Sequence, residues 1–150
     1  MKSRVESRSA PVSPISDAQV HEEQLVKAFV IPAKRNRLLF LLEHQQKKRR
    51  KVALNSLNHF RDLDYRFAHR IEPSKQNPAD IEQLLRHKGA PTNCYVISDD
   101  WDIDGQFMPL KDALVAVVGY GFGTFLSCVP GKLAYFECEG INERYILEKS

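Results

Sequence analysis

The chain has 150 residues, of which 43% are hydrophobic and 27% are charged, and this composition is typical of a soluble globular protein of about one domain. Its net charge of +3 conceals a division: residues 1–75 hold 16 Lys and Arg against 8 Asp and Glu, whereas residues 76–150 hold 6 against 11. Together with apolar runs of at most six residues, these numbers exclude an acidic disordered chain, a disulfide-stapled miniprotein and a membrane-spanning helix.

Residues 1–17 are rich in Ser, Pro and Arg, and we expect a disordered tail because they hold too little apolar surface to offset the entropy of ordering. Residues 18–150 are expected to form a single domain. Its first element, residues 25–31, is β-branched and aromatic and is bounded by Pro32, which favours a short strand.

Two helices are predicted next, over residues 33–44 and residues 47–60, because both segments are rich in good helix formers. In the second helix, steps of three and four residues place one set of side chains on a common face: Arg50, Ala53, Leu54, Leu57 and Phe60. Residues 62–75 then read as a connector, since charges interrupt the apolar residues and Pro73 prevents a helix from continuing.

Residues 77–89 carry the clearest helix signals. Asn77 is a good cap, Pro78 occupies the first helical position, and Gly89 ends the segment. A strand over residues 94–98 and an Asp-rich turn follow. The sequence then predicts a helix over residues 109–118 that ends at a glycine.

The last thirty residues have the pattern of a small sheet. Strands are expected over residues 124–129, 133–138 and 144–147, with Pro130 and Gly131 suited to a type II turn between the first two. The simplest pairing is an antiparallel meander. The fold class is therefore α+β, with several short helices packed on one face of a small antiparallel sheet.

The densest charge feature is the pair of helices in residues 34–51, where eight cations face the single acid Glu43. Five consecutive cations repel one another unless they are solvated or neutralised by an anion such as nucleic-acid phosphate. The alternative is a solvated face, or one paired with the acidic half of this chain. The candidate nucleic-acid-binding residues are Lys34, Arg35, Arg37, Lys47, Lys48, Arg49, Arg50 and Lys51.

Residues 100–105 match the D-x-D-x-D-G opening of a calcium loop. The match ends there, because Lys111 occupies the position of the bidentate Glu and a strand, not a helix, precedes the loop. We prefer a turn in which the Asp side chains accept hydrogen bonds from local amides. No metal ion or other cofactor is predicted.

Glycines at positions 119, 121 and 123 resemble a nucleotide loop only superficially, because a helix precedes them and a strand follows, the reverse of a phosphate cradle. Helix termination and a close turn explain them better. Catalysis has one weak candidate, in which His59 and the nearby Asp62 and Asp64 act as an acid/base group; His59 and Asp62 would share a face if the helix extended past Phe60.

The C-terminal third is rich in aromatic residues, and part of this set is expected on an open sheet face. Such a patch, or the free edge of the third strand, would suit a homodimer contact. The three cysteines are widely spaced and are expected to stay reduced, as in a cytoplasmic protein.

The sequence thus predicts a small cytoplasmic protein without catalytic residues that binds or regulates a macromolecular partner, in the first instance another protein. One alternative is a nucleic-acid-binding or ribosome-associated protein that uses the basic helices. The other is a hydrolytic enzyme built around His59, Asp62 and Asp64. No contact with a membrane is expected.

Overall fold

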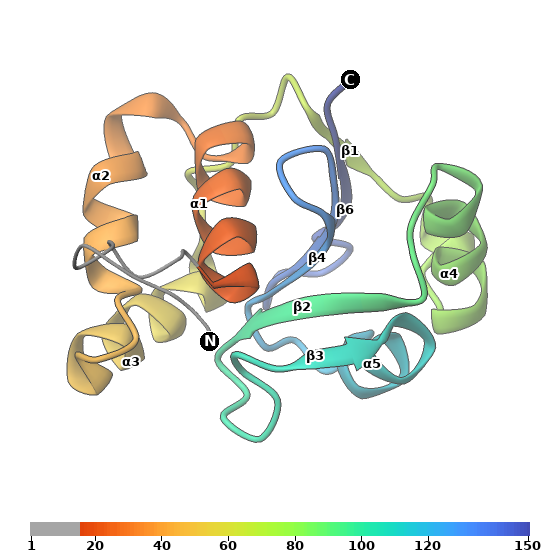
Figure 1. The fold of residues 1–150 in the computed structure, drawn as a ribbon. Helices are drawn as coiled ribbons and strands as arrows, with labels where there is room; N and C mark the ends of the chain where they lie inside the picture. The colour runs from red at the N-terminus through yellow and green to blue at the C-terminus, as the bar shows by residue number, and fades with distance from the viewer. Residues whose placement is uncertain (1–15) are drawn as a thin grey trace, which may run out of the picture.

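The computed structural model describes residues 16–150, and its helices and strands are shown in Figure 1. Of the predicted tail, residues 1–15 lie outside the described residues. The helices are α1 (Asp17–Phe29), α2 (Pro32–Leu41), α3 (Lys47–Ser56), α4 (Pro78–His87) and α5 (Leu110–Val117), with single 3₁₀ turns η1 (Leu57–His59) and η2 (Pro73–Lys75). The strands are β1 (Ala68–Arg70), β2 (Asn93–Ser98), β3 (Phe107–Pro109), β4 (Thr124–Val129), β5 (Leu133–Glu137) and β6 (Arg144–Glu148).

The predicted strand over residues 25–31 is wrong, because most of this segment is the second half of α1. Ser16 caps the helix in a capping box with Gln19, and a buried stripe runs along it at helical spacing. The β-branched residues at its end only terminate the helix: Val30 is extended and forms an isolated bridge with Leu63. A strong start signal upstream thus outweighed the local strand propensity.

The helices predicted over residues 33–44, 47–60, 77–89 and 109–118 are confirmed as α2, α3 with η1, α4 and α5. All five residues assigned to the apolar face of the second helix are buried: Arg50, Ala53, Leu54, Leu57 and Phe60. Asn77 caps α4 through a hydrogen bond from the amide of Asp80, as predicted. The predicted connector over residues 62–75 contains β1 and η2.

The C-terminal meander is confirmed, and it forms the centre of a larger antiparallel sheet. The strand order is β1–β6–β5–β4–β2–β3. The predicted free edge at residues 144–147 is therefore wrong, because β6 pairs with β1 from Ala68↔Leu147 to Arg70↔Tyr145. The sheet edges are instead the three-residue strands β1 and β3.

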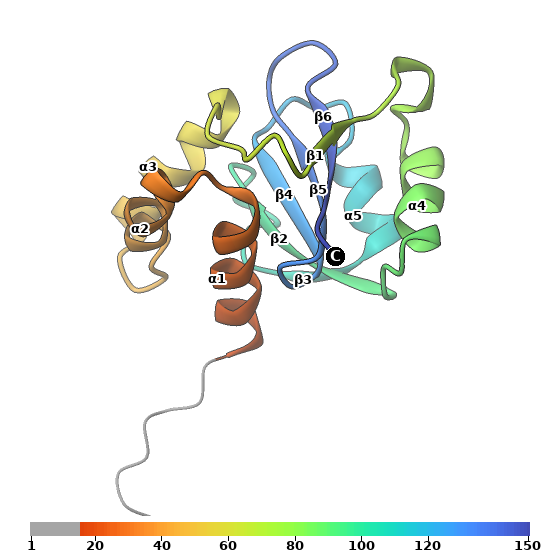
Figure 2. The ribbon, with the colours of Figure 1, turned by 90° about the horizontal axis from the view of Figure 1, so that it is seen from above.

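Helices cover both faces of this sheet, not one face as the sequence suggested (Figure 2). Helices α1, α2 and α3 pack on one face against residues such as Phe125 and Phe136, whereas α4 and α5 pack on the other against Val96 and Leu126. Neighbouring residues of a strand point to opposite faces, so each central strand is buried on both sides and is almost continuously apolar. The α+β class is confirmed. In residues 16–150, no helix has the length and apolar character needed to cross a membrane.

Candidate functional site

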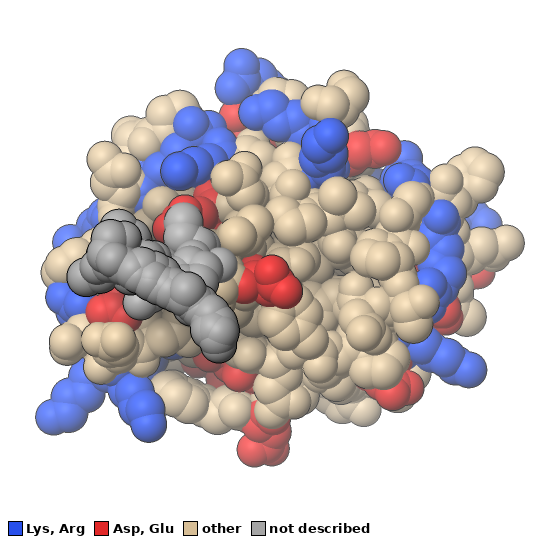
Figure 3. Space-filling view, in the orientation of Figure 1, with Lys and Arg blue, Asp and Glu red and all other residues tan. Residues whose placement is uncertain are grey.

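The cations of residues 34–51 lie on α2 and α3, two consecutive helices on one side of the sheet. Five of them are exposed, Arg35 and Arg49 are half-buried, and only Arg50 is buried. Lys and Arg side chains project from the lower left of the space-filling view, where Figure 1 places α3 (Figure 3). We call the seven accessible cations the basic face: Lys34, Arg35, Arg37, Lys47, Lys48, Arg49 and Lys51.

Within residues 16–150, no member of the basic face forms an ion pair with a carboxylate. Arg35 uses its Nε to donate to the carbonyl oxygen of Val30, 2.8 Å away, at the end of α1. The acidic half of the described chain therefore does not neutralise this face. Its positive potential is directed to solvent, where it can attract an anionic ligand.

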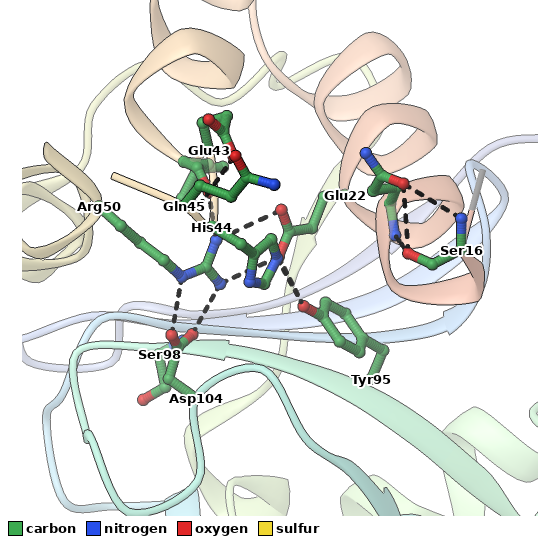
Figure 4. A network of polar contacts seen from close by, with 11 residues as sticks. Ser16, Glu22, Glu43, His44, Gln45, Arg50, Tyr95, Ser98 and Asp104 are labelled. Atoms are coloured by element: carbon green, nitrogen blue, oxygen red, sulfur yellow. Dashed lines mark hydrogen bonds and ion pairs between the residues drawn. The ribbon is translucent and has the colours of Figure 1, made fainter. Parts of the chain in front are cut away.

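Arg50 has a different role, because it points inward and links three elements (Figure 4). Its Nη2 lies 2.9 Å from Glu22 of α1, and its Nε lies 2.9 Å from Asp104 of the turn after β2. Its Nη1 donates to the carbonyl oxygen of Leu42, 2.6 Å away, just after α2. The guanidinium thus satisfies the end of one helix and two buried carboxylates. Arg50 is accordingly not available to a ligand.

The surroundings of this cluster raise the pKa of both Arg50 and Tyr95. Burial opposes the charge of Arg50, but hydrogen bonds and proximity to Asp104 and Glu22 outweigh it and raise the pKa of the guanidinium. Burial first, and the neighbouring Glu22 second, raise the pKa of Tyr95, whose hydroxyl donates to Glu22 over 2.6 Å. His44, which lies beside a cavity of about 460 Å³, bonds the same carboxylate over 2.9 Å. Glu22 is therefore fully occupied by protein donors.

Two exposed aromatic rings lie beside α3, and one cation of the basic face lies over each ring. The guanidinium carbon of Arg49 lies 3.9 Å from the ring centre of Phe40 on α2. The Nζ of Lys51 lies 5.4 Å from the ring centre of Trp101, in the turn after β2. Phe40 is 56% exposed and Trp101 is 50% exposed, so both rings remain open to solvent. Cations over aromatic faces are attracted by the ring quadrupole.

A groove of about 410 Å³ separates α2 from α3 and η1. Leu38, Leu41 and Phe60 contribute apolar lining, and Lys34 and Arg37 contribute cations from α2. The basic face is thus not uniformly polar, because apolar surface lies between its charges. A ligand with both phosphate and flat apolar parts matches this alternation.

The acidic turn behaves as the turn interpretation predicted. Asp100 accepts a hydrogen bond from the amide of Asp102, and Asp104 accepts one from the amide of Ser98. Asp99 is bound by the side-chain amide of Asn58. The carboxylates therefore diverge toward separate donors. In the part of the chain that the structure describes, no group of three or more His, Cys, Asp or Glu is placed to hold a metal ion.

The glycine segment ends α5 and turns the chain into β4, as predicted. Gly119 has φ +90°, a conformation that side chains rarely adopt, and its amide donates to the buried carboxylate of Glu137. The amide of Gly121, the hydroxyl of Tyr135 and the guanidinium of Arg144 donate to the same carboxylate. The anion that these amides bind is thus an internal carboxylate, and not a nucleotide phosphate.

The acid/base candidates do not converge. η1 ends at His59 and Phe60 is extended, so His59 and Asp62 do not share a helix face, although both line the groove beside α2. His59 instead lies 3.3 Å from Glu139. The carboxylate of Asp64 is held by Arg66 at 2.7 Å. His59 and Asp64 therefore have other partners, and His59 and Asp62 share only the lining of the groove.

The three cysteines are free and buried, each in a strand or directly after one. Burial raises the pKa of Cys94 to about 12 and raises the pKa of Cys128 as well. A thiol with a raised pKa holds little thiolate near neutral pH, and the thiolate is the nucleophilic form. Neither thiol is therefore activated for nucleophilic chemistry.

Sequence reasoning missed the aromatic partners of the basic face and the inward role of Arg50. Phe40 and Trp101 are separated from their cations by nine and fifty residues, so no local pattern joins them. A signal for Arg50 did exist, because its helical spacing placed it among apolar residues. A cation on a buried face requires paired carboxylates.

No protein-family model matches the chain, and comparisons with curated proteins and with solved structures give no significant similarity.

Proposed function

We propose that this protein binds nucleic acid through the basic face of α2 and α3. The observation that carries the proposal is the division among the eight cations: Arg50 is consumed by two buried carboxylates, whereas the other seven are accessible and unpaired within residues 16–150. Like charges held together on a surface are costly unless an anion relieves them. Phosphate esters supply closely spaced negative charge along an extended ligand.

The proposed activity is binding without catalysis, in the cytoplasm. Free, buried cysteines support a reducing compartment. Phosphate contacts by Lys and Arg carry no sequence information, so the basic face is proposed to recognise the backbone and not a particular base sequence. Binding should therefore weaken steeply with added salt, because each phosphate contact releases condensed counterions.

Fluorescence anisotropy with labelled oligonucleotides tests the proposal. The triple variant Lys47→Gln, Lys48→Gln and Lys51→Gln removes exposed cations of α3 and should weaken binding by roughly tenfold or more. A matched control removes the same charge elsewhere, at the exposed Lys75, Lys111 and Lys132, and should bind nearly as well as the wild type. Equal losses in both variants would show that net charge, and not the basic face, governs binding.

A homodimer is a second candidate, supported by exposed apolar side chains at one end of the sheet. Tyr120, Phe122 and Ile141 are 68%, 45% and 90% exposed, and they line one cavity of about 490 Å³. Apolar side chains gathered on a surface are typical of protein contacts. Sedimentation velocity of the wild type and of Ile141→Ser over a range of concentrations tests this contact. A monomer throughout for the wild type would contradict it.

A further inference from the structure

The two cation–aromatic pairs beside α3 share a common arrangement. Phe40 comes from α2, and Trp101 comes from the turn after β2. In each pair the cation belongs to α3 and the ring belongs to its neighbour. Each ring is half exposed or more, so the cation does not cover it completely. The surface beside α3 therefore offers two aromatic faces, each next to a positive charge.

Arg49 differs from the other cations of the basic face in the surroundings of its guanidinium. Its Nε is buried and has no hydrogen-bond partner, so a ligand would contact the terminal Nη1 and Nη2 of the guanidinium. Its guanidinium carbon lies 3.9 Å from the ring centre of Phe40, and this contact holds the group beside the ring. A guanidinium held in this way presents a planar fork that matches two oxygens of one phosphate. A lysine at the same position would supply charge without that fork.

The exposed rings distinguish between two forms of nucleic acid. In a duplex both faces of each internal base are already stacked on neighbouring bases, so a protein ring has no free base to contact. In a single strand the bases can unstack and lie on aromatic side chains while the phosphates contact cations. A duplex would engage the cations of α3 and leave Phe40 and Trp101 without partners.

We infer that the ligand of the basic face is single-stranded nucleic acid, with bases stacked on Phe40 and Trp101 and a phosphate held by Arg49. This inference rests on the proposed function and adds the strandedness of the ligand and the residues that recognise it. Stacking tolerates every base, since each has a π face. The site is accordingly selective for unpaired strands and not for a sequence.

The single tryptophan of the chain makes the test direct, because all tryptophan fluorescence comes from position 101. We would titrate the wild-type protein with a 15-nucleotide oligothymidine, its RNA counterpart, a duplex of equal length and polyphosphate, which is a polyanion without bases. The single strands should quench Trp101 fluorescence and should bind more tightly than the duplex. Polyphosphate should bind through charge alone and leave the fluorescence unchanged.

Anisotropy of variants completes the test. Phe40→Leu and Trp101→Leu keep every charge and should each weaken single-strand binding by roughly fivefold or more, with little effect on polyphosphate. Arg49→Lys should weaken it as well, because the charge remains and the fork is lost. Tyr65→Leu, which changes a half-exposed ring that packs on Tyr145 of β6, should bind as the wild type does.

The outcomes separate the inference from the proposed function. Equal affinity for single strand and duplex, without a change in Trp101 fluorescence, would overturn the inference and leave nucleic-acid binding intact. Quenching by polyphosphate as strong as that by oligothymidine would also overturn stacking. Absence of binding to every oligonucleotide would remove the proposed function, and the inference with it.

Discussion

Arg50 and Asp104 form a two-point ion pair, in which Nε lies 2.9 Å from Oδ2 and Nη2 lies 3.0 Å from Oδ1. This pair joins the basic helix α3 to the acidic turn after β2. The pair uses one of the eight cations of residues 34–51 and one carboxylate of the turn. The other seven cations form the basic face. The basic helices and the acidic turn are therefore joined by one buried ion pair, whereas the seven cations of the basic face stay open to solvent.

Removing Arg50 should destabilise the fold strongly. In Arg50→Met, Glu22 and Asp104 remain buried without their counter-charge, and loss of one partner of a buried pair costs about 3–5 kcal/mol. Urea unfolding measures the change in the free energy of unfolding. The exposed Lys48 on the same helix is the control, because Lys48→Met should change it by no more than about 0.5 kcal/mol. A loss for Arg50→Met as small as that of the control would contradict a central role for this pair.

Gly123 should not tolerate a side chain. An added Cβ would lie 2.5 Å from the backbone nitrogen of Asn58 and closer still to the carbonyl carbon of Leu57, and neither backbone atom can move without shifting η1. Gly123→Ala should therefore lower the free energy of unfolding by about 1–3 kcal/mol or more.

Gly140→Ala provides a comparison for this prediction, because its Cβ would meet the flexible side chain of Glu143, which can rotate away. Thermal or urea unfolding of both variants should give a clearly larger loss for Gly123→Ala. Equal stability of the two variants would show that the glycine segment does not pack against η1 as described.

Stability should depend on pH through His21. Its Nδ1 lies 2.6 Å from the hydroxyl of Ser127. Burial lowers its pKa below the usual 6.5 and outweighs the negative charge of Asp17, which raises the pKa. Below pH 6.5 the unfolded chain binds a proton at His21 more readily than the folded chain does. This contribution to stability is therefore complete above pH 6.5 and is lost as the pH falls through 6.5 toward the lower, folded-state pKa.

The variant His21→Gln should show a flatter dependence of unfolding free energy on pH than the wild type, between about pH 7 and about pH 5.5. The slope, and not the absolute stability, is the readout, because the substitution also changes packing. His87→Gln, at an exposed position, should keep the wild-type slope. An unchanged slope in His21→Gln would contradict the prediction.

The thiols should be unreactive in the native protein. Cys94, Cys128 and Cys138 are at most 3% exposed, and burial raises the pKa of Cys94 to about 12. Alkylation by iodoacetamide at about pH 8 should be slow in buffer and should become rapid for all three thiols in urea, because the buried sulfur atoms become accessible only on unfolding. Rapid alkylation of the native chain would show that the thiols are accessible to the reagent, which would contradict their burial in this fold.

Local patterns predicted much of this fold. The caps of α4, the buried stripe of α3 and the turn at Gly131 all depend on residues within a few positions of one another, so their signals are complete in short windows. The meander was predicted for the same reason. The error at residues 25–31 came from weighing β-branched side chains without the helix that begins at Ser16.

The parts that sequence could not supply depend on distant pairs. β1 pairs with β6 across more than seventy residues, and this pairing turns an expected edge into the interior of the sheet. Arg50 meets Glu22 and Asp104 at separations of 28 and 54 residues. Trp101 reaches Lys51 in the same way. The basic face could be predicted from composition and the inward position of Arg50 from its helical spacing, whereas the aromatic borders of the face and the carboxylate partners of Arg50 required the tertiary fold.

The salt dependence of binding tests the account most directly. For the wild type, the logarithm of the association constant for oligothymidine should fall linearly with the logarithm of salt concentration, by about 0.7 for each phosphate contacted on a single strand. The variant with Gln at positions 47, 48 and 51 should have a slope shallower by up to about 2, whereas the control variant at positions 75, 111 and 132 should keep the wild-type slope. Identical slopes for all three proteins would contradict binding through the basic face.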